Sequence, residues 1–168
     1  MGGLGMMYDT KNGTEHYAEN HLGGIMDLTG YMTKTPLIKN LPKGIVNCYD
    51  QAAAVCSFGS LLGVEMKYKL MQPFGFVKAH DLVGVGNCNS PFYKDKRTNP
   101  IVLPNAYERT AFGTHAFAVS DGKVYDACFG PATGTQTEFQ YVSDTIDVSR
   151  GFFGTTNNIS LKAVRELK

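Results

Sequence analysis

The chain has 168 residues, of which 43% are hydrophobic and 18% are charged, a size and composition that fit one folded domain. Sixteen Lys and Arg residues against fifteen Asp and Glu residues leave a formal net charge of +1. So balanced a charge, with no Lys/Arg cluster, argues against a nucleic-acid-binding protein. No run approaches the roughly 18 apolar residues of a transmembrane helix, so we expect no membrane span and a soluble protein, cytoplasmic or secreted.

The first third of the chain gives weak signals. Residues 1–14 are rich in glycine and lack the features of a secretory signal, so we expect a flexible start or a domain cut from a longer protein. Apolar residues at partial helical spacing predict a helix over Glu15–Met32, although glycines interrupt it. His16 and His21 lie five residues apart, off the i, i+4 spacing of helical metal ligands.

The clearest helix runs from Asn47 to about Leu62. Asn47 is a favourable N-cap, and Asp50 stands three residues on, where the acid of a capping box belongs. Gly63 is typical of the residue that follows a helix. The apolar stripe of this helix consists of Ala52, Val55, Cys56, Gly59 and Leu62.

Strand signals follow this helix. Apolar and charged residues alternate over Val64–Met71, which predicts a strand. Residues 74–87 suggest a second strand, and the proline-containing stretch 88–110 a long irregular loop. The tail from Phe129 reads as mixed strand and loop, with a short helix near Leu161–Leu167.

A β-hairpin is predicted around Asp121-Gly122, since Asp-Gly is a preferred centre of a type I′ turn. Its strands are His115–Val119 and Val124–Cys128. One helix followed by antiparallel strands indicates an α+β fold.

Cys48 is the first candidate for chemistry. As the first residue after the N-cap, its thiol lies at the positive end of the helix dipole, which favours a nucleophilic thiolate. Free backbone N–H groups there could also hold an oxyanion. The Asp50 carboxylate works against a second negative charge. Taken alone, Cys48 is also compatible with a small buried core residue.

His115 and Asp126 strengthen this interpretation. In the expected register Val119 pairs with Val124, which puts Phe117 opposite Asp126 and makes His115 its diagonal neighbour on one face. Diagonal neighbours lie about 7–8 Å apart at the backbone, within reach of long side chains. A carboxylate so placed can fix the tautomer of an imidazole and support its charged form.

The chain resembles the transglutaminase-like core of the papain-related cysteine enzymes, in which a Cys at a helix start precedes a His and then an Asp on two strands. The resemblance covers about residues 44–128, and its most specific part is Gly44–Val64. The matching stretches are Asn47-Cys48-Tyr49-Asp50-Gln51-Ala52, Leu61–Val64, His115–Val119 and Val124-Tyr125-Asp126.

This resemblance implies one transglutaminase-like catalytic domain over residues 1–168, with a papain-like fold in which an N-terminal catalytic helix packs on an antiparallel sheet. It implies a Cys48–His115–Asp126 triad that transfers acyl groups from amide or peptide carbonyls through a thioester, without cofactor or metal. The implied partner is a protein or peptide substrate. If this chain is a bacterial effector or toxin domain, an inhibitor or immunity protein is a second expected partner.

The subtype stays open among peptidase, glutamine deamidase and transglutaminase. Members typically carry Trp two residues after the His, where this chain has Phe117, and the acidic clusters of calcium-dependent transglutaminases are absent from the sequence. An alternative from another class is a non-catalytic binding domain that keeps the fold.

The remaining cysteines are weaker candidates. The four cysteines contain no C-x-x-C pair, which argues against structural zinc, and we expect free thiols, although a disulfide-stapled secreted module is a third hypothesis. Cys56 lies in mid-helix and is interpreted as core, and Cys88 lies in a loop without an activating group. Cys128 falls opposite His115 in the expected register, as packing or as a redox partner of Cys48.

Overall fold

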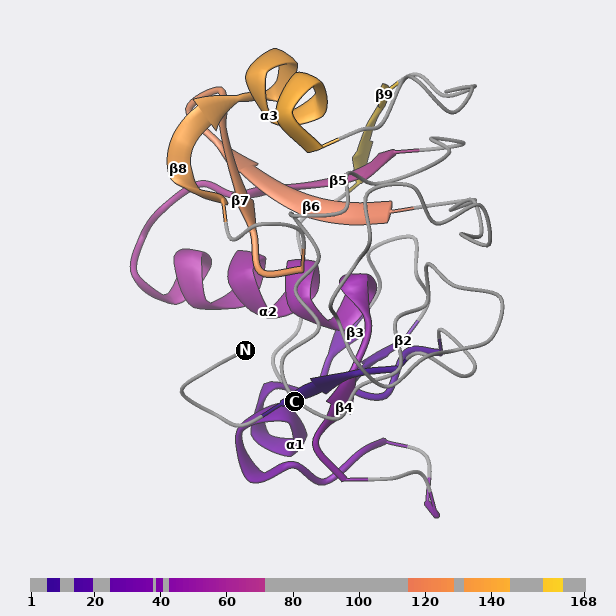
Figure 1. Cartoon of the computed structure of the whole chain (residues 1–168). Coiled ribbons are helices and arrows are strands. Elements are labelled where there is room, and N and C mark those ends of the chain that lie inside the picture. Colours follow the sequence, from indigo (N-terminus) through magenta and orange to yellow (C-terminus); the bar gives the residue numbers. More distant parts are fainter. Residues whose placement is uncertain are drawn as a thin grey trace, which may run out of the picture.

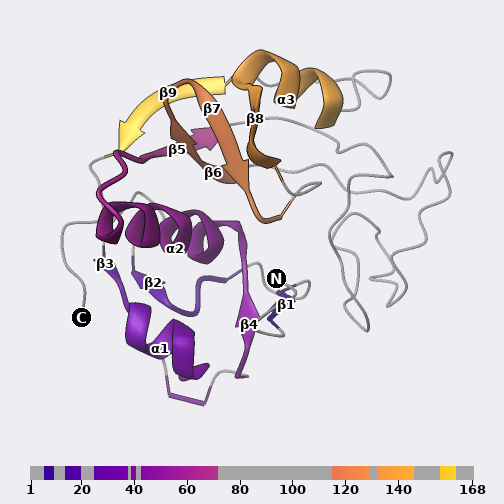
Figure 2. The same ribbon diagram turned by 90° about the vertical axis from the view of Figure 1, so that its left-hand side faces the viewer.

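A five-stranded antiparallel sheet forms the centre of the computed structural model (Figure 1). Its order is β8-β7-β6-β5-β9, where β5 is Lys67–Met71, β6 His115–Ser120, β7 Lys123–Asp126, β8 Ala132–Thr137 and β9 Thr156–Leu161. Helix α2 (Cys48–Leu61) packs on one face, mainly against β6, and helix α3 (Glu138–Thr145) lies over the other face (Figures 1 and 2). Helices on an antiparallel sheet confirm the α+β class.

The structure describes only part of the chain. The described ranges are 6–9, 14–19, 25–37, 39–40, 43–71, 115–128, 132–145 and, for the backbone, 156–161. The strand expected at 74–87 and the loop at 88–110 lie outside these ranges, as does the helix expected near 161–167 apart from Leu161, which ends β9. Within the described ranges, every helix is too short or too polar to cross a membrane.

Small N-terminal elements cover the side of α2 that faces away from the sheet (Figure 2). They are β1 (Met7–Tyr8) paired in parallel with β4 (Ile45–Val46), the antiparallel pair β2 (Ala18–Glu19) and β3 (Ile25–Met26), and helix α1 (Leu28–Thr33). Helix α2 therefore lies between two layers, which explains why Ala52, Ala53 and Ala54, on successive sides of the helix, are all buried.

At the start of the chain, Met7 and Tyr8 pair with β4 and Met6 is buried. One expectation about the N-terminal third is corrected. The helix expected over Glu15–Met32 is wrong, since β2, β3 and the short α1 occupy this segment. The cause is a distant carboxylate: Asp50 accepts the backbone N–H groups of residues 16, 17 and 18 at 2.8–3.1 Å.

The predicted caps of α2 are confirmed. The Asn47 side chain accepts the N–H of Asp50 at 3.0 Å, and the Asp50 carboxylate accepts the N–H of Asn47 at 3.1 Å, which together form a capping box. Gly63 follows the helix with φ +76°, a conformation that favours glycine. Leu62, expected within the apolar stripe, is instead 81% exposed at the C-cap.

Strand β5 begins later than predicted. Val64 caps the C-terminus of α2 from beyond its end, since its N–H bonds the carbonyl of Gly59 at 2.8 Å. Met66 packs over Gly59, where a Cβ would lie 2.5 Å from the Met66 side chain. The strand therefore starts at Lys67, although the alternation of apolar and charged residues begins at Val64.

The predicted hairpin is confirmed in its turn and register. Asp121 and Gly122 both have positive φ, at 48° and 69°, as a type I′ turn requires. Val119 pairs with Val124. Strand β7 ends at Asp126, two residues earlier than expected, so Cys128 is not opposite His115 in the ladder.

Candidate active site

Cys48 is the first residue of α2, as predicted, and its side chain is buried. The capping box directly before it fixes where the helix begins and therefore where the thiol lies. The backbone N–H groups of a first helical turn point along the axis and favour negative charge near them. The sulfur thus lies at the electropositive end of the helix.

His115 and Asp126 meet as the hairpin register predicts. His115 opens β6 and Asp126 ends β7, and the His115 Nε2 lies 2.8 Å from the Asp126 Oδ2. The imidazole is fully buried and Asp126 is 5% exposed. Removal from water strengthens the interaction between an imidazolium and a carboxylate. The pair can therefore hold a proton in a fixed orientation.

The side chain of Cys48 completes the cluster, since it lies close enough to His115 to raise the pKa of the imidazole. Burial lowers the pKa of His115, but the charge and hydrogen bond of Asp126, together with the neighbouring Cys48 side chain, raise it to about 9. An imidazole with this pKa is cationic at neutral pH. The three residues selected from the sequence are thus brought together around a charged imidazole.

Tyr141 of α3 is part of this cluster and was not anticipated. Its hydroxyl donates to the Asp126 Oδ2 at 2.5 Å and lies 3.2 Å from the His115 Nε2. Its ring packs on Phe117, with centroids 5.2 Å apart, and the Phe117 ring stacks on His115 at 6.1 Å. Phe117 stands where transglutaminase-like proteins typically have Trp, and its ring packs against both Tyr141 and His115.

Helix α3 itself was missed in a tail expected to be strand and loop. The sequence holds a signal for it, because Thr137 and Gln140 have the spacing of a capping box. In the structure the Gln140 N–H bonds the Thr137 Oγ1 at 3.3 Å, and the Gln140 Oε1 accepts the Thr137 N–H at 3.0 Å. Phe139 on this helix is 83% exposed, so the apolar residues of α3 do not all lie on its buried face.

The other described cysteines are poor nucleophiles. Burial raises the pKa of Cys56 to about 12. Burial, together with the charges of Asp126 and Cys48, raises the pKa of Cys128 well above its usual value. Cys128 contributes through its backbone instead, since its N–H bonds the Asp126 Oδ1 at 2.7 Å. Cys48, Cys56 and Cys128 are free thiols, and Cys88 lies outside the described residues.

Asp50 was expected to oppose a thiolate at Cys48. Its carboxylate is instead fully buried against the N–H groups of Asn47 and of residues 16–18. Burial raises the pKa of Asp50, and these N–H donors act in the opposite direction. Asp50 therefore joins the N-terminal segment to α2 and stabilises the helix start that carries Cys48.

A second buried His–Asp pair lies in the N-terminal segment. The His16 Nε2 is 3.1 Å from the Asp9 Oδ2, and the two side chains are 2% and 8% exposed. A contact between His16 and Asp9 was not predicted from the sequence. No group of three or more His, Cys, Asp or Glu side chains in the described ranges could hold a metal ion.

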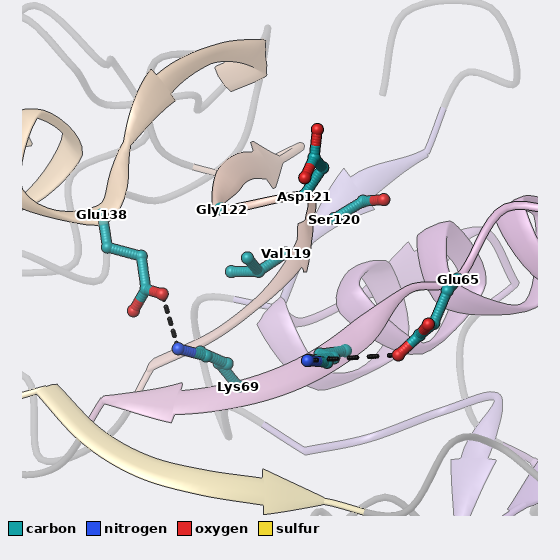
Figure 3. A pocket seen from close by; sticks show the side chains of 8 residues that line it. Glu65, Lys69, Val119, Ser120, Asp121, Gly122 and Glu138 are labelled. Atoms are coloured by element: carbon teal, nitrogen blue, oxygen red, sulfur yellow. Dashed lines mark hydrogen bonds and ion pairs between the residues drawn. The ribbon is translucent and has the colours of Figure 1, made fainter.

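An open cavity of about 470 Å³ lies on the outer surface of the sheet, at the far end of β6 (Figure 3). Lys69 and Glu138 form an ion pair across it at 2.5 Å, and Lys67 lies 4.0 Å from Glu65 at its rim (Figure 3). His115 lies about 13 Å along the strand from Val119, which lines this cavity. None of Cys48, His115 and Asp126 lines it.

No protein-family model, no curated protein and no solved structure matches this chain.

Proposed function

We propose that this protein is a cysteine-dependent acyl-transfer enzyme of the transglutaminase-like, papain-related type. Cys48 is the nucleophile, His115 the general acid and base, and Asp126 the residue that orients His115. The observation that supports this most is the buried chain of contacts from Cys48 through His115 to Asp126, built on a helix N-terminus.

The reaction follows from these positions. The Cys48 thiolate attacks the carbonyl carbon of an amide, and the developing oxyanion is stabilised by the backbone N–H of Cys48 at the helix start. The C–N bond breaks as the His115 imidazolium gives its proton to the leaving amine, which leaves a thioester on Cys48. Water or an amine then attacks the thioester, gives a proton to His115, and releases the acyl product with Cys48 restored.

The choice of acceptor defines the subtype. Water as acceptor gives a peptidase or a glutamine deamidase, and an amine gives a transglutaminase. The proposed substrate is a protein or peptide, and the proposed biological setting is a bacterial effector or toxin domain with an inhibitor or immunity protein as partner. The packing of α2 on an antiparallel sheet agrees with a papain-like arrangement.

Alkylation by iodoacetamide tests the nucleophile. The protein is treated at about pH 6, and peptide mass spectrometry follows each cysteine separately. We expect Cys48 to react at least about tenfold faster than Cys56 and Cys128, because its thiolate is paired with an imidazolium. His115→Ala should remove this advantage. Equal reactivity of all cysteines in the wild-type protein would overturn the enzyme proposal and favour a non-catalytic domain.

Substrate screening tests the reaction class. Candidate proteins are incubated with the wild-type chain and with Cys48→Ala, and intact masses are compared. Fragments indicate a peptidase, the mass increment of an amide converted to an acid indicates a deamidase, and joined chains indicate a transglutaminase. The matched control is Cys56→Ala, which removes a thiol from the same helix and should retain activity.

A further inference from the structure

The phenol of Tyr141 touches both members of the His115–Asp126 pair. Its oxygen lies 2.5 Å from the Asp126 Oδ2 and 3.2 Å from the His115 Nε2, and the side chain is fully buried. Tyr141 belongs to α3, which covers the sheet face opposite α2 (Figure 1). The pair is therefore held from an element that the proposed triad does not include.

The direction of the hydrogen bond follows from chemistry. Burial and the neighbouring charge of Asp126 raise the pKa of Tyr141 well above its usual value, so the phenol keeps its proton at neutral pH. Its O–H therefore donates to the carboxylate. The other carboxylate oxygen accepts the N–H of Cys128 at 2.7 Å. One oxygen of Asp126 is thus tied to α3, and the other to the bend that directly follows β7.

We propose that Tyr141 is a positioning residue that fixes the Asp126 carboxylate against His115 in the buried site. The inference rests on the proposed function of Cys48. A donor to a buried carboxylate stabilises the ionised form. A carboxylate that stays ionised supports the imidazolium, and the imidazolium in turn supports the Cys48 thiolate.

Among the residues that the structure describes, the titratable groups next to His115 include Asp126 from β7, Tyr141 from α3 and Cys48 from α2. The Cys128 thiol in turn interacts with Asp126 and Cys48. Opposite His115 on β5 stands Met71, which carries no charge. Without the Tyr141 hydroxyl, the Asp126 carboxylate loses one hydrogen-bond donor and is held less firmly against the imidazole. The imidazolium is then less well supported, and it supports the Cys48 thiolate less.

The test is the rate of Cys48 alkylation by iodoacetamide across about pH 5 to pH 9.5 in the full chain. In Tyr141→Phe, which keeps the ring that packs on Phe117, we expect the rate at about pH 6 to fall about tenfold and the acid limb to move upward by about one pH unit. At about pH 9 the rate should stay within about twofold of wild type. Thermal unfolding of each variant shows whether the fold is kept.

The matched control is Tyr125→Phe, which removes a hydroxyl next to Asp126 in the chain but packs on Gly134, and its profile should equal that of wild type. Replacement of Tyr141 by 3,5-difluorotyrosine strengthens the donor without removing the ring, and should move the acid limb downward. This second variant tests the inference even where Tyr141→Phe unfolds.

The outcomes separate the two proposals. A wild-type Cys48 that is no more reactive than Cys56 at about pH 6 overturns the proposed function and the role of Tyr141 with it. A reactive wild-type Cys48 whose acid limb does not move in either Tyr141 variant overturns the role of Tyr141 alone. A lower melting temperature with an unchanged profile assigns Tyr141 to packing, which also overturns its positioning role.

Discussion

At the scale of single residues, the protonation of His115 is coupled to folding. Its imidazole is fully buried, and it gains a carboxylate partner on folding that the unfolded chain does not hold in place. The groups that bond Asp126 include the His115 ring, the Tyr141 hydroxyl and the Cys128 N–H. The charge of one ring therefore depends on residues from three segments of the chain.

The first prediction concerns stability against pH. The pKa of His115 rises from 6.5 to about 9 on folding, so its contribution is fully present below about pH 6.5 and is lost as pH rises through 9. This shift corresponds to a loss of about 3 kcal/mol in the free energy of unfolding. Urea unfolding at about pH 6.5 and pH 9.5 measures it. His115→Gln should remove most of the difference, and an equal pH dependence in both proteins would contradict the assignment.

At the scale of elements, Asp50 couples α2 to the segment before it. Its carboxylate serves the capping box and also accepts N–H groups from residues 16–18, so one side chain holds a helix start and a distant loop together. Because Cys48 lies within the same first turn, the position of the thiol depends on this junction.

We predict that Asp50→Asn weakens this junction. One oxygen becomes an NH₂ donor that faces backbone donors, so the free energy of unfolding should fall by about 2–4 kcal/mol. Hydrogen exchange of the amides of residues 16–18 should also accelerate. Asp144→Asn is the matched control, since Asp144 is exposed on α3. Unchanged exchange at 16–18 in Asp50→Asn would show that this carboxylate does not hold the segment.

Local signals explain which elements could be predicted from the sequence. Helix α2 and the β6–β7 hairpin depend on caps and turn residues within a few positions, and both were predicted with the correct register. Helix α3 has the same kind of signal in Thr137 and Gln140, but its apolar periodicity is weak, since Phe139 is exposed. The helix expected over Glu15–Met32 failed because Asp50, more than thirty positions away, takes the backbone donors of that segment.

The same distinction holds for the candidate site. His115 and Asp126 share one hairpin, so strand geometry alone could place them together. Tyr141 reaches Asp126 from a separate helix, and neither periodicity nor turn chemistry specifies that docking. The contact depends on how α3 packs over the sheet, which only the folded chain reveals.

At the scale of the whole molecule, the N-terminal residues form part of the layer that covers α2. Residues 7 and 8 pair with β4, the Asp9 N–H bonds the Val46 carbonyl at 2.7 Å, and Asp9 contacts His16 in the interior. Val46 directly precedes the cap of α2. The start of the chain is therefore connected to the segment that carries Cys48.

We predict that removal of residues 1–9 destabilises the protein. The loss of the β1–β4 pairing and of the buried Asp9–His16 contact should lower the melting temperature by about 5–10 °C, as expected for a few kcal/mol in a chain of this size. Circular dichroism measures the transition. Asp9→Ala, which keeps the backbone pairing, should show a smaller decrease. An unchanged melting temperature after truncation would agree with the flexible start expected from glycine content.

The turn at Asp121-Gly122 also has a consequence for evolution and engineering. Since side chains alternate along β7, a one-residue insertion that shifts its pairing would rotate position 126 away from the imidazole while the strands could still pair. A change in the length of the turn should therefore abolish the reactivity of the site in one step, whereas a change in the residues of the turn should alter it gradually. Lengthening this turn by one residue offers a way to make an inert scaffold with every original side chain retained.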